Sequence, residues 1–213
     1  TDRHHVKPAK LPGSRKSAEK VPLLDCYTAP CQDACPIHQE IPTYVKLAGE
    51  GKYEEALQVI LNRNALPFIT GTICAHGCQS HCTRNFYESD VKIRDTKLLC
   101  ANKAYEKVID TIKPAPSCGK KAAIVGGGPA GMAAAYYLAK LGVAVTIYEK
   151  RDRLGGIVSA VIPDFRIDDS VIEKDASFLA KLGVQVIYNK EVTSIEKLRQ
   201  ENDAVILAVG AYK

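Results

Sequence analysis

Two groups of three cysteines constrain this chain more than any other feature of its sequence. The first group consists of Cys26, Cys31 and Cys35, and the second of Cys74, Cys78 and Cys82. The eight cysteines of the whole chain would allow four disulfides in a secreted protein, but the sequence has no signal-peptide core. Clustered thiols in a reducing compartment indicate metal or redox chemistry. We therefore expect the first half of the chain to fold around a metal or iron–sulfur site.

The composition excludes several classes of protein. With 46% hydrophobic and 25% charged residues, it is that of a globular protein. No apolar run reaches the roughly 18 residues of a membrane span, and the net charge of +5 comes from Lys and Arg spread along the chain. We therefore expect a cytoplasmic protein that binds no nucleic acid and no membrane. Because the sequence begins at Thr1 and has one internal Met, we also expect a piece of a longer chain.

The pattern of apolar residues divides the chain into four segments. Residues 1–20 are polar and basic and are predicted to form a flexible arm. Residues 21–113 carry apolar positions at helical spacing, in stretches at 41–51, 52–64 and 94–112. A Pro-rich linker at 114–120 precedes residues 121–213. In that last segment, helices expected at 129–141 and 171–182 alternate with apolar strands at 122–125, 143–149, 184–188 and 204–209.

The predicted fold class is therefore α + α/β. A helical domain that carries the metal or cluster site is followed by a partial Rossmann-like domain with a parallel sheet, because alternating strands and helices of this length build parallel sheets. The sequence stops directly after the last predicted strand, so we expect this dinucleotide domain to be truncated.

A glycine-rich turn follows the first predicted strand. Gly126, Gly128 and Gly131 form G-x-G-x-x-G, in which the glycines allow a tight turn, close approach of the pyrophosphate and close packing of helix on sheet. The helix N-terminus offers free N–H groups to the phosphates. Glu149 ends the second strand, where a carboxylate accepts hydrogen bonds from ribose hydroxyls. The spacing predicts a dinucleotide site, and a turn that only packs is the alternative. A Gly-Gly pair soon after Glu149 and the strand end AVILAVGA favour FAD.

The spacing of the cysteines predicts how they divide between two clusters. Cys35 is followed by proline, so the first group ends in C-x3-C-P like the bacterial ferredoxin run, in which the last cysteine ligates the other cluster. The resulting sets are Cys35 with Cys74 and Cys78, and, by rough symmetry, Cys82 with Cys26 and Cys31. Each set has three thiolates. Structural zinc is the alternative, although zinc sites favour C-x2-C pairs.

Four segments, in this order along the chain, resemble a known family. They are DCYTAPCQDACPIHQEIPTYV, NALPFITGTICAHGCQSHC, GGGPAG and GGIVSAVIPDFRI. Together they resemble the glutamate synthase small-subunit family, which also covers the N-terminal part of dihydropyrimidine dehydrogenase and selenate-reductase-type subunits. The segment LLDCYTAPC is most similar to the selenate-reductase-type branch. The resemblance spans almost all of the chain after about residue 20.

The family implies a helical domain with two 4Fe-4S clusters and an FAD domain with an inserted NADPH domain. Electrons pass from NADPH to FAD and through the clusters to a partner subunit or domain. By position, the resemblance implies the same two cysteine sets. For FAD it implies Gly126, Gly128, Pro129, Ala130, Gly131, Glu149, Lys150, Gly155, Gly156, Val192 and Gly210.

Two positions depart from the family pattern. The family has a further cysteine where this chain has Leu23, and a Gln or Glu ligand near the place of Lys97. A protonated Lys cannot ligate iron, so we expect one cluster to be absent, labile or of the three-iron type. Cys100, one helical turn beyond Lys97, is a candidate replacement ligand. For the first cluster, Asp25 or solvent is a candidate.

The predicted function is the electron-transfer portion of an NAD(P)H-dependent flavin/iron–sulfur oxidoreductase. Because the chain has one G-x-G-x-x-G pattern, we expect the NAD(P)H domain to be absent from it and the isolated fragment to be catalytically incomplete. Its partner would be a redox subunit or domain. The alternative function is a zinc-stabilised docking module joined to a dinucleotide-binding domain.

Overall fold

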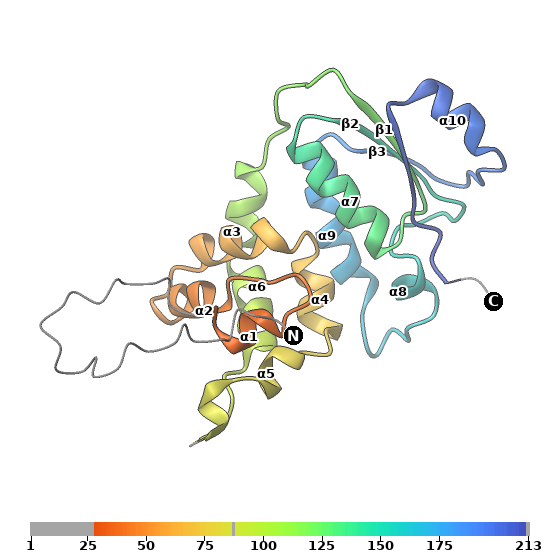
Figure 1. Cartoon of the computed structure of the whole chain (residues 1–213). Helices are drawn as coiled ribbons and strands as arrows, with labels where there is room; N and C mark the ends of the chain where they lie inside the picture. The colour runs from red at the N-terminus through yellow and green to blue at the C-terminus, as the bar shows by residue number, and fades with distance from the viewer. Residues whose placement is uncertain (1–27, 87, 212–213) are drawn as a thin grey trace, which may run out of the picture.

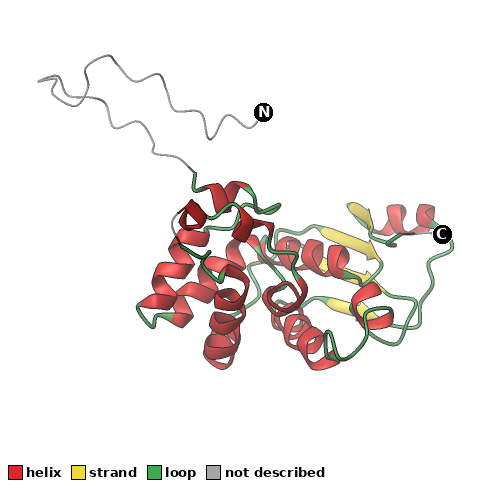
Figure 2. Cartoon of the chain, turned by 90° about the horizontal axis from the view of Figure 1, so that it is seen from below, coloured by secondary structure: helices red, strands yellow, loops and turns green. Residues whose placement is uncertain are grey.

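A helical half precedes a half built on a parallel sheet (Figure 1). The computed structural model describes residues 28–86 and 88–211. The first half contains α1 (Pro30–Asp33), α2 (Ile41–Gly49), α3 (Tyr53–Arg63), α4 (Pro67–Ile73), α5 (Gly77–Ser80), the 3-10 helix η2 (Thr83–Phe86) and α6 (Ile93–Thr111). The second contains β1 (Lys121–Val125), α7 (Pro129–Lys140), β2 (Ala144–Tyr148), α8 (Ile157–Ala160), α9 (Asp169–Lys181), β3 (Gln185–Ile187), α10 (Ile195–Glu201) and β4 (Ala204–Leu207). The predicted α + α/β fold class is confirmed, and Figure 2 shows the strands gathered at one end of the molecule.

The helical half is organised around α6, which contacts α2, α3 and α4. The apolar face predicted for α3 is buried against these neighbours, with Ala56, Leu57 and Ile60 fully inaccessible to solvent. Proline stands in the first turn of α1, α2 and α4, where its fixed φ suits a helix start and its missing N–H costs nothing. Within the described residues, no helix is both long and apolar enough to cross a membrane.

The sheet has the strand order β3-β2-β1-β4, and all of its pairs are parallel. The central strand β1 is the most buried, because Ala122, Ala123 and Ile124 are covered on both sides. Helix α7 packs on β1 and β2. A glycine at position 131 permits this approach, because a Cβ there would lie 2.0 Å from the carbonyl oxygen of Gly126. The turn between β1 and α7 thus lies in close contact with the backbone at the start of α7, as is typical of dinucleotide-binding folds.

One buried carboxylate joins the two halves. Asp175 of α9 is inaccessible to solvent, and its oxygens accept the backbone N–H groups of Phe68 (3.1 Å) and Ile69 (2.8 Å) in the first turn of α4. The N-cap residue of α4, Leu66, provides no side-chain acceptor of its own. Asp175 therefore caps a helix of the other half of the chain, about a hundred residues away in sequence, and satisfies N–H groups that every helix start leaves free.

Aromatic side chains surround this cap. The rings of Phe68, Tyr105 and Phe178 lie 5.4–6.3 Å apart between centroids, from α4, α6 and α9. The Tyr105 hydroxyl is 2.8 Å from the hydroxyl of Ser177, and the Lys174 ammonium lies 5.1 Å from the centre of the Phe68 ring. Such ring pairs and cation–π contacts add to the free energy of burial. The two halves therefore share one continuous hydrophobic core.

Replacing Asp175 should change how the stability of the protein depends on pH. Burial raises the pKa of Asp175 to about 7, although the N–H groups of Ile69 and Phe68 and the charge of Lys97 act in the opposite direction. A carboxyl whose pKa is higher in the folded state stabilises that state at low pH, and this contribution is lost as the pH rises through the folded pKa. Between pH 5 and pH 8 we expect the wild type to lose roughly 2–3 kcal/mol of unfolding free energy relative to Asp175→Asn.

Urea unfolding of the cluster-free chain at several pH values measures this difference. Asp110→Asn is the matched control, because Asp110 is an exposed carboxylate on α6 that pairs with Lys181 at 3.3 Å. Its stability should follow the wild type across the pH range. Parallel curves for the wild type and Asp175→Asn would contradict the assignment.

Candidate functional site

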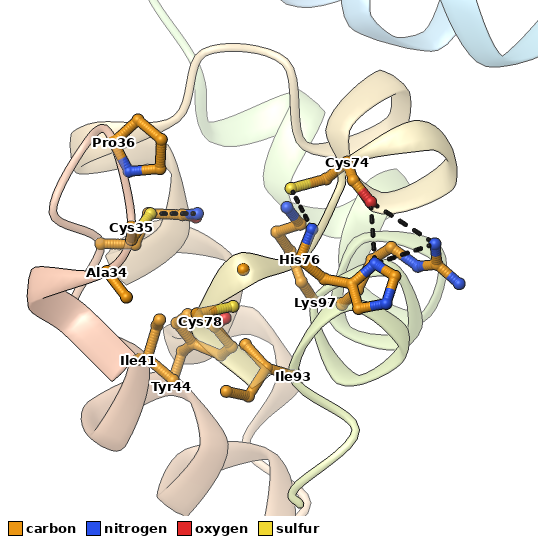
Figure 3. A pocket seen from close by; sticks show the side chains of 13 residues that line it. Ala34, Cys35, Pro36, Ile41, Tyr44, Cys74, His76, Cys78, Ile93 and Lys97 are labelled. Atoms are coloured by element: carbon orange, nitrogen blue, oxygen red, sulfur yellow. Dashed lines mark hydrogen bonds between the residues drawn. The ribbon is translucent and has the colours of Figure 1, made fainter. Parts of the chain in front are cut away.

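Three cysteines of the two groups line one pocket in the helical half. Cys35 follows α1, Cys74 directly follows α4, and Cys78 lies in α5. Figure 3 shows the three side chains around this pocket, with Tyr44 of α2 and Lys97 of α6 among the residues that line it. The pocket is therefore formed by elements that span residues 34–97, and it brings together one cysteine of the first group with two of the second.

The turn between Cys74 and Cys78 is held by hydrogen bonds around Cys74. His76 adopts a left-handed backbone conformation (φ 45°) just before α5 begins. Its backbone N–H donates to Cys74 Sγ at 3.3 Å, and its ring Nδ1 lies 3.1 Å from the Cys74 carbonyl oxygen. Arg94 of α6 donates to the same carbonyl at 3.4 Å. The chain therefore reverses here with the Cys74 sulfur fixed as a hydrogen-bond acceptor.

Cys35 is held by a buried amide that the sequence did not reveal. Gln39 Nε2 lies 3.7 Å from Cys35 Sγ, and Asn64 Nδ2 donates to Gln39 Oε1 at 3.3 Å. Both amide side chains are buried. The second hydrogen bond orients Gln39 so that its N–H group faces the sulfur, which is how an outer residue fixes a ligand.

The electrostatics of the pocket are unusual for a protein interior. Burial raises the pKa of the Cys78 thiol to about 11, and the neighbouring thiols of Cys35 and Cys74 contribute to the rise. Lys97 is 3% exposed. Burial lowers the pKa of its ammonium, while Cys74, Cys35 and Cys78 act in the opposite direction. The pocket thus places a buried lysine beside three thiols.

The remaining described cysteines of the two groups are Cys31 in α1 and Cys82 between α5 and η2. Helix α1 contacts α5. Burial raises the pKa of the Cys31 thiol, and Cys82 is the largest electrostatic contribution to this rise. Cys26 lies outside the described residues, as do Leu23 and Asp25. The structure thus brings Cys35, Cys74 and Cys78 to one pocket and places Cys31 near enough to Cys82 and Cys35 for their charges to interact.

Cys100 lies apart from the cysteines that line the pocket. It is fully buried in α6, and burial raises the pKa of its thiol to about 11. It is not among the residues that line the pocket, although Lys97 is. Across residues 28–86 and 88–211, no group of three His, Cys, Asp or Glu side chains is placed to hold a single metal ion. The geometry thus gives no support to Cys100 as a replacement ligand.

The glycine-rich turn forms the second candidate site, at the C-terminal end of β1. Gly126 has φ 106°, and a Cβ at this position would lie 2.4 Å from the carbonyl oxygen of Ala208. Gly155 N–H donates to the Gly127 carbonyl at 2.9 Å, and a Cβ at Gly156 would lie 2.8 Å from the Cα of Gly128. The two glycine segments therefore pack backbone to backbone. Together they form the face at which parallel sheets bind dinucleotides.

Glu149 ties the two segments together. It is 5% exposed. Its carboxylate accepts the N–H of Gly127 at 2.6 Å and the N–H of Arg151 at 2.9 Å. The carboxylate therefore orders the turn from within, and its predicted bonds to ribose hydroxyls stay a prediction.

The other predicted cofactor residues surround this turn. Pro129 and Ala130 begin α7, and Lys150 is exposed after β2. Val192 is half-buried in the loop before α10, and Gly210 is exposed after β4 with φ 80°. Their roles toward a cofactor stay predictions.

Comparisons with known proteins agree with this arrangement. Residues 11–109 match the family model of the dihydropyrimidine dehydrogenase domain II with its 4Fe-4S cluster, and residues 124–190 match that of an NAD(P)-binding Rossmann-like domain. A solved structure of histamine dehydrogenase from Rhizobium sp. 4-9 aligns with 88% of this chain and with 25% of the histamine dehydrogenase chain. The TM-score is 0.43 and the sequence identity 18%, so this similarity is too distant to carry an argument.

Curated relatives extend the similarity over both halves. A provisionally named oxidoreductase of Escherichia coli K12, YgfK, is 44% identical over 92% of this chain. The beta subunit of the NADPH-Fe(3+) oxidoreductase of Geobacter sulfurreducens is 37% identical over 96%, and the glutamate synthase [NADPH] small chain of Bacillus subtilis is 34% identical over 89%. The chain spans 19%, 31% and 41% of these three relatives, respectively.

The predicted family is thereby confirmed, while the finer assignment to the selenate-reductase-type branch stays a prediction. The chain belongs to the glutamate synthase small-chain-like oxidoreductases, with a dihydropyrimidine dehydrogenase-type 4Fe-4S domain ahead of a Rossmann-like domain.

Proposed function

We propose that this chain is the electron-transfer portion of an NAD(P)H-dependent flavin/iron–sulfur oxidoreductase. It relays electrons between FAD and a partner redox subunit or domain in the cytoplasm. The observation that carries the proposal is the pocket in which Cys35, Cys74 and Cys78 converge from separate segments of the chain. A cluster-type domain and a dinucleotide-type domain in one chain support transfer of electrons between the two.

The residues of the pocket fit an iron–sulfur cluster. Three thiols line it, two of them accept N–H hydrogen bonds, and the hydroxyl of Tyr44 has no hydrogen-bond partner among the described residues. Thiolates hold iron–sulfur clusters, and hydrogen bonds to their sulfurs adjust the reduction potential. When bound, a 4Fe-4S cluster supplies one-electron chemistry. The chain's own contribution is to hold the sulfurs in place, exclude water and orient donors toward them.

The cofactor at the glycine-rich turn is proposed to be FAD. The backbone contact of the two glycine segments supports a pyrophosphate at the N-terminus of α7, because only glycine leaves the backbone open to it. The pyridine nucleotide would bind to a domain outside this chain. The proposed boundaries are an iron–sulfur domain at 21–113, a linker at 114–120 and the FAD domain from 121.

The proposed ligand sets are interleaved. Cys35, Cys74 and Cys78 hold one cluster, and Cys26, Cys31 and Cys82 hold the other. Each proposed cluster takes ligands from both cysteine groups. Replacing a cysteine of one group should therefore remove the same cluster as replacing its co-ligand in the other group, which tests the sets directly.

Single Cys→Ala variants should therefore fall into two classes after anaerobic reconstitution of the full chain with iron and sulfide. Cys35→Ala and Cys78→Ala should lose one component of the electron paramagnetic resonance (EPR) spectrum of the reduced protein. Cys31→Ala and Cys82→Ala should lose the other. Iron and acid-labile sulfide analysis quantifies each loss, and far-UV circular dichroism verifies folding.

Cys118→Ala is the matched control, because Cys118 is an exposed free thiol between α6 and β1, and it should keep both components. The interleaved sets would be overturned if Cys31→Ala and Cys35→Ala removed the same component. Stoichiometric zinc without sulfide would instead establish the docking-module alternative and end the electron-transfer proposal.

Lys97→Gln tests the departure from the family pattern. An amide oxygen can bind iron, whereas an ammonium has no lone pair to donate. The change also removes a desolvated basic group beside three thiols. We expect iron to leave the Lys97→Gln protein on the order of tenfold more slowly when a chelator is added, since single residues around metal sites change affinity by this much.

The rate of iron loss is followed by absorbance of the chelated iron. Lys103→Gln, an exposed lysine on the same helix, is the control and should release iron like the wild type. Equal or faster release from Lys97→Gln would mean that Lys97 supports the cluster rather than replacing a ligand.

A further inference from the structure

The hydroxyl of Tyr44 is a buried polar atom that calls for an explanation. Tyr44 lies in α2 and is completely inaccessible to solvent. Its oxygen has no hydrogen-bond partner among the described residues. A buried hydroxyl without a partner destabilises the folded state, and most buried polar groups in native proteins have a partner. A phenylalanine would fill the same space without this cost, so the surroundings of the oxygen decide what it contributes.

Tyr44 faces the pocket that the three thiols share. It lines the pocket with Cys35, Cys74 and Cys78, and Figure 3 shows it on the same side as Cys78. Burial raises the pKa of Tyr44, and among its neighbours the Cys78 thiol raises it most. A phenol hydroxyl carries its proton at neutral pH, so it acts as a donor toward a thiolate.

The hydrogen bonds already present leave one sulfur without a donor. Cys74 Sγ accepts the backbone N–H of His76, and Cys35 Sγ lies within reach of Gln39 Nε2. Within the described part of the chain, no such bond reaches Cys78. The sulfur without a donor and the donor without an acceptor thus line the same pocket.

We propose that Tyr44 donates its O–H to the Cys78 sulfur once the cluster is bound, and that this bond raises the reduction potential of the cluster. The inference rests on the proposed function. Metal binding converts the thiol into a thiolate, which is a much stronger acceptor. Adding one electron places further negative charge on the sulfurs, so the O–H group stabilises the reduced state more than the oxidised one.

Tyr44→Phe is the direct test, because it removes one oxygen and keeps the ring. Anaerobically reconstituted full-length protein is titrated potentiometrically and followed by EPR. We expect the equilibrium constant for reduction of one component to fall about tenfold, which is a shift of about 59 mV to more negative potential for one electron. The shifted component should be the one that Cys78→Ala removes. An exchangeable-proton coupling in the electron–nuclear double resonance spectrum of that component should also disappear.

Tyr137→Phe is the matched control. Tyr137 in α7 also has a buried hydroxyl without a partner among the described residues, but it is not part of the pocket lining. Its removal should leave both potentials unchanged. A shift of equal size in Tyr137→Phe would show a general effect of buried hydroxyls and would overturn the proposal.

The remaining outcomes separate this proposal from the proposed function. If the wild type assembles no cluster, the proposed function fails. If Tyr44→Phe carries full iron and sulfide but keeps the wild-type potential, the function stands and the role of Tyr44 is refuted. In the cluster-free protein, Tyr44→Phe should unfold at the same or a higher urea concentration. A lower midpoint would reveal a structural partner of the hydroxyl and also contradict the proposal.

Discussion

The buried carboxylate of Asp175 is the contact on which the arrangement of both halves depends. It accepts two backbone N–H groups at the start of α4, and Cys74 directly follows the end of that helix. Because α4 is a short rigid rod of seven residues, fixing its first turn also fixes where its last residue lies. The sheet-bearing half therefore helps to position a thiol of the helical half. This explains why the two halves share one core instead of meeting through a mobile linker.

The pocket combines features that oppose one another in an apolar interior. Burial raises the pKa of the Cys78 thiol and lowers that of the Lys97 ammonium, because it disfavours the charged form of each. The Lys97 ammonium and the thiolates favour each other's charged forms, whereas Cys35 and Cys74 disfavour the ionisation of Cys78. The surrounding hydrogen bonds from His76 and Gln39 already have the direction that thiolates require. The interior is thus arranged for negative sulfurs.

Local patterns in the sequence predicted most of the fold. Alternating strands and helices with glycines at the β1–α7 turn led to the parallel sheet, and the apolar spacing of residues 52–64 identified the buried face of α3. The contribution of Asp175 was not predictable, because a lone aspartate in an amphipathic helix resembles a solvent-exposed residue. The role of Gln39 was missed because the amide that orients it, Asn64, is distant in sequence, and Tyr44 was missed because an aromatic residue in an amphipathic helix resembles an ordinary core residue. Short helices such as α5 and α8 carry too few residues for a periodic signal.

The proposed pairing of cysteines across the two groups has a consequence for the stability of the helical half. In the proposed ligand sets Cys31 stands with Cys82 and Cys35 with Cys78, so the two loops of chain that they would close overlap almost completely. A cluster held by each ligand set would act as a crosslink that reduces the entropy of the unfolded chain. Because the loops overlap, losing one cluster would leave nearly the same segment of chain crosslinked by the other. The free energy of unfolding would then depend on the iron supply, and loss of one cluster would lower it while the second crosslink stayed in place.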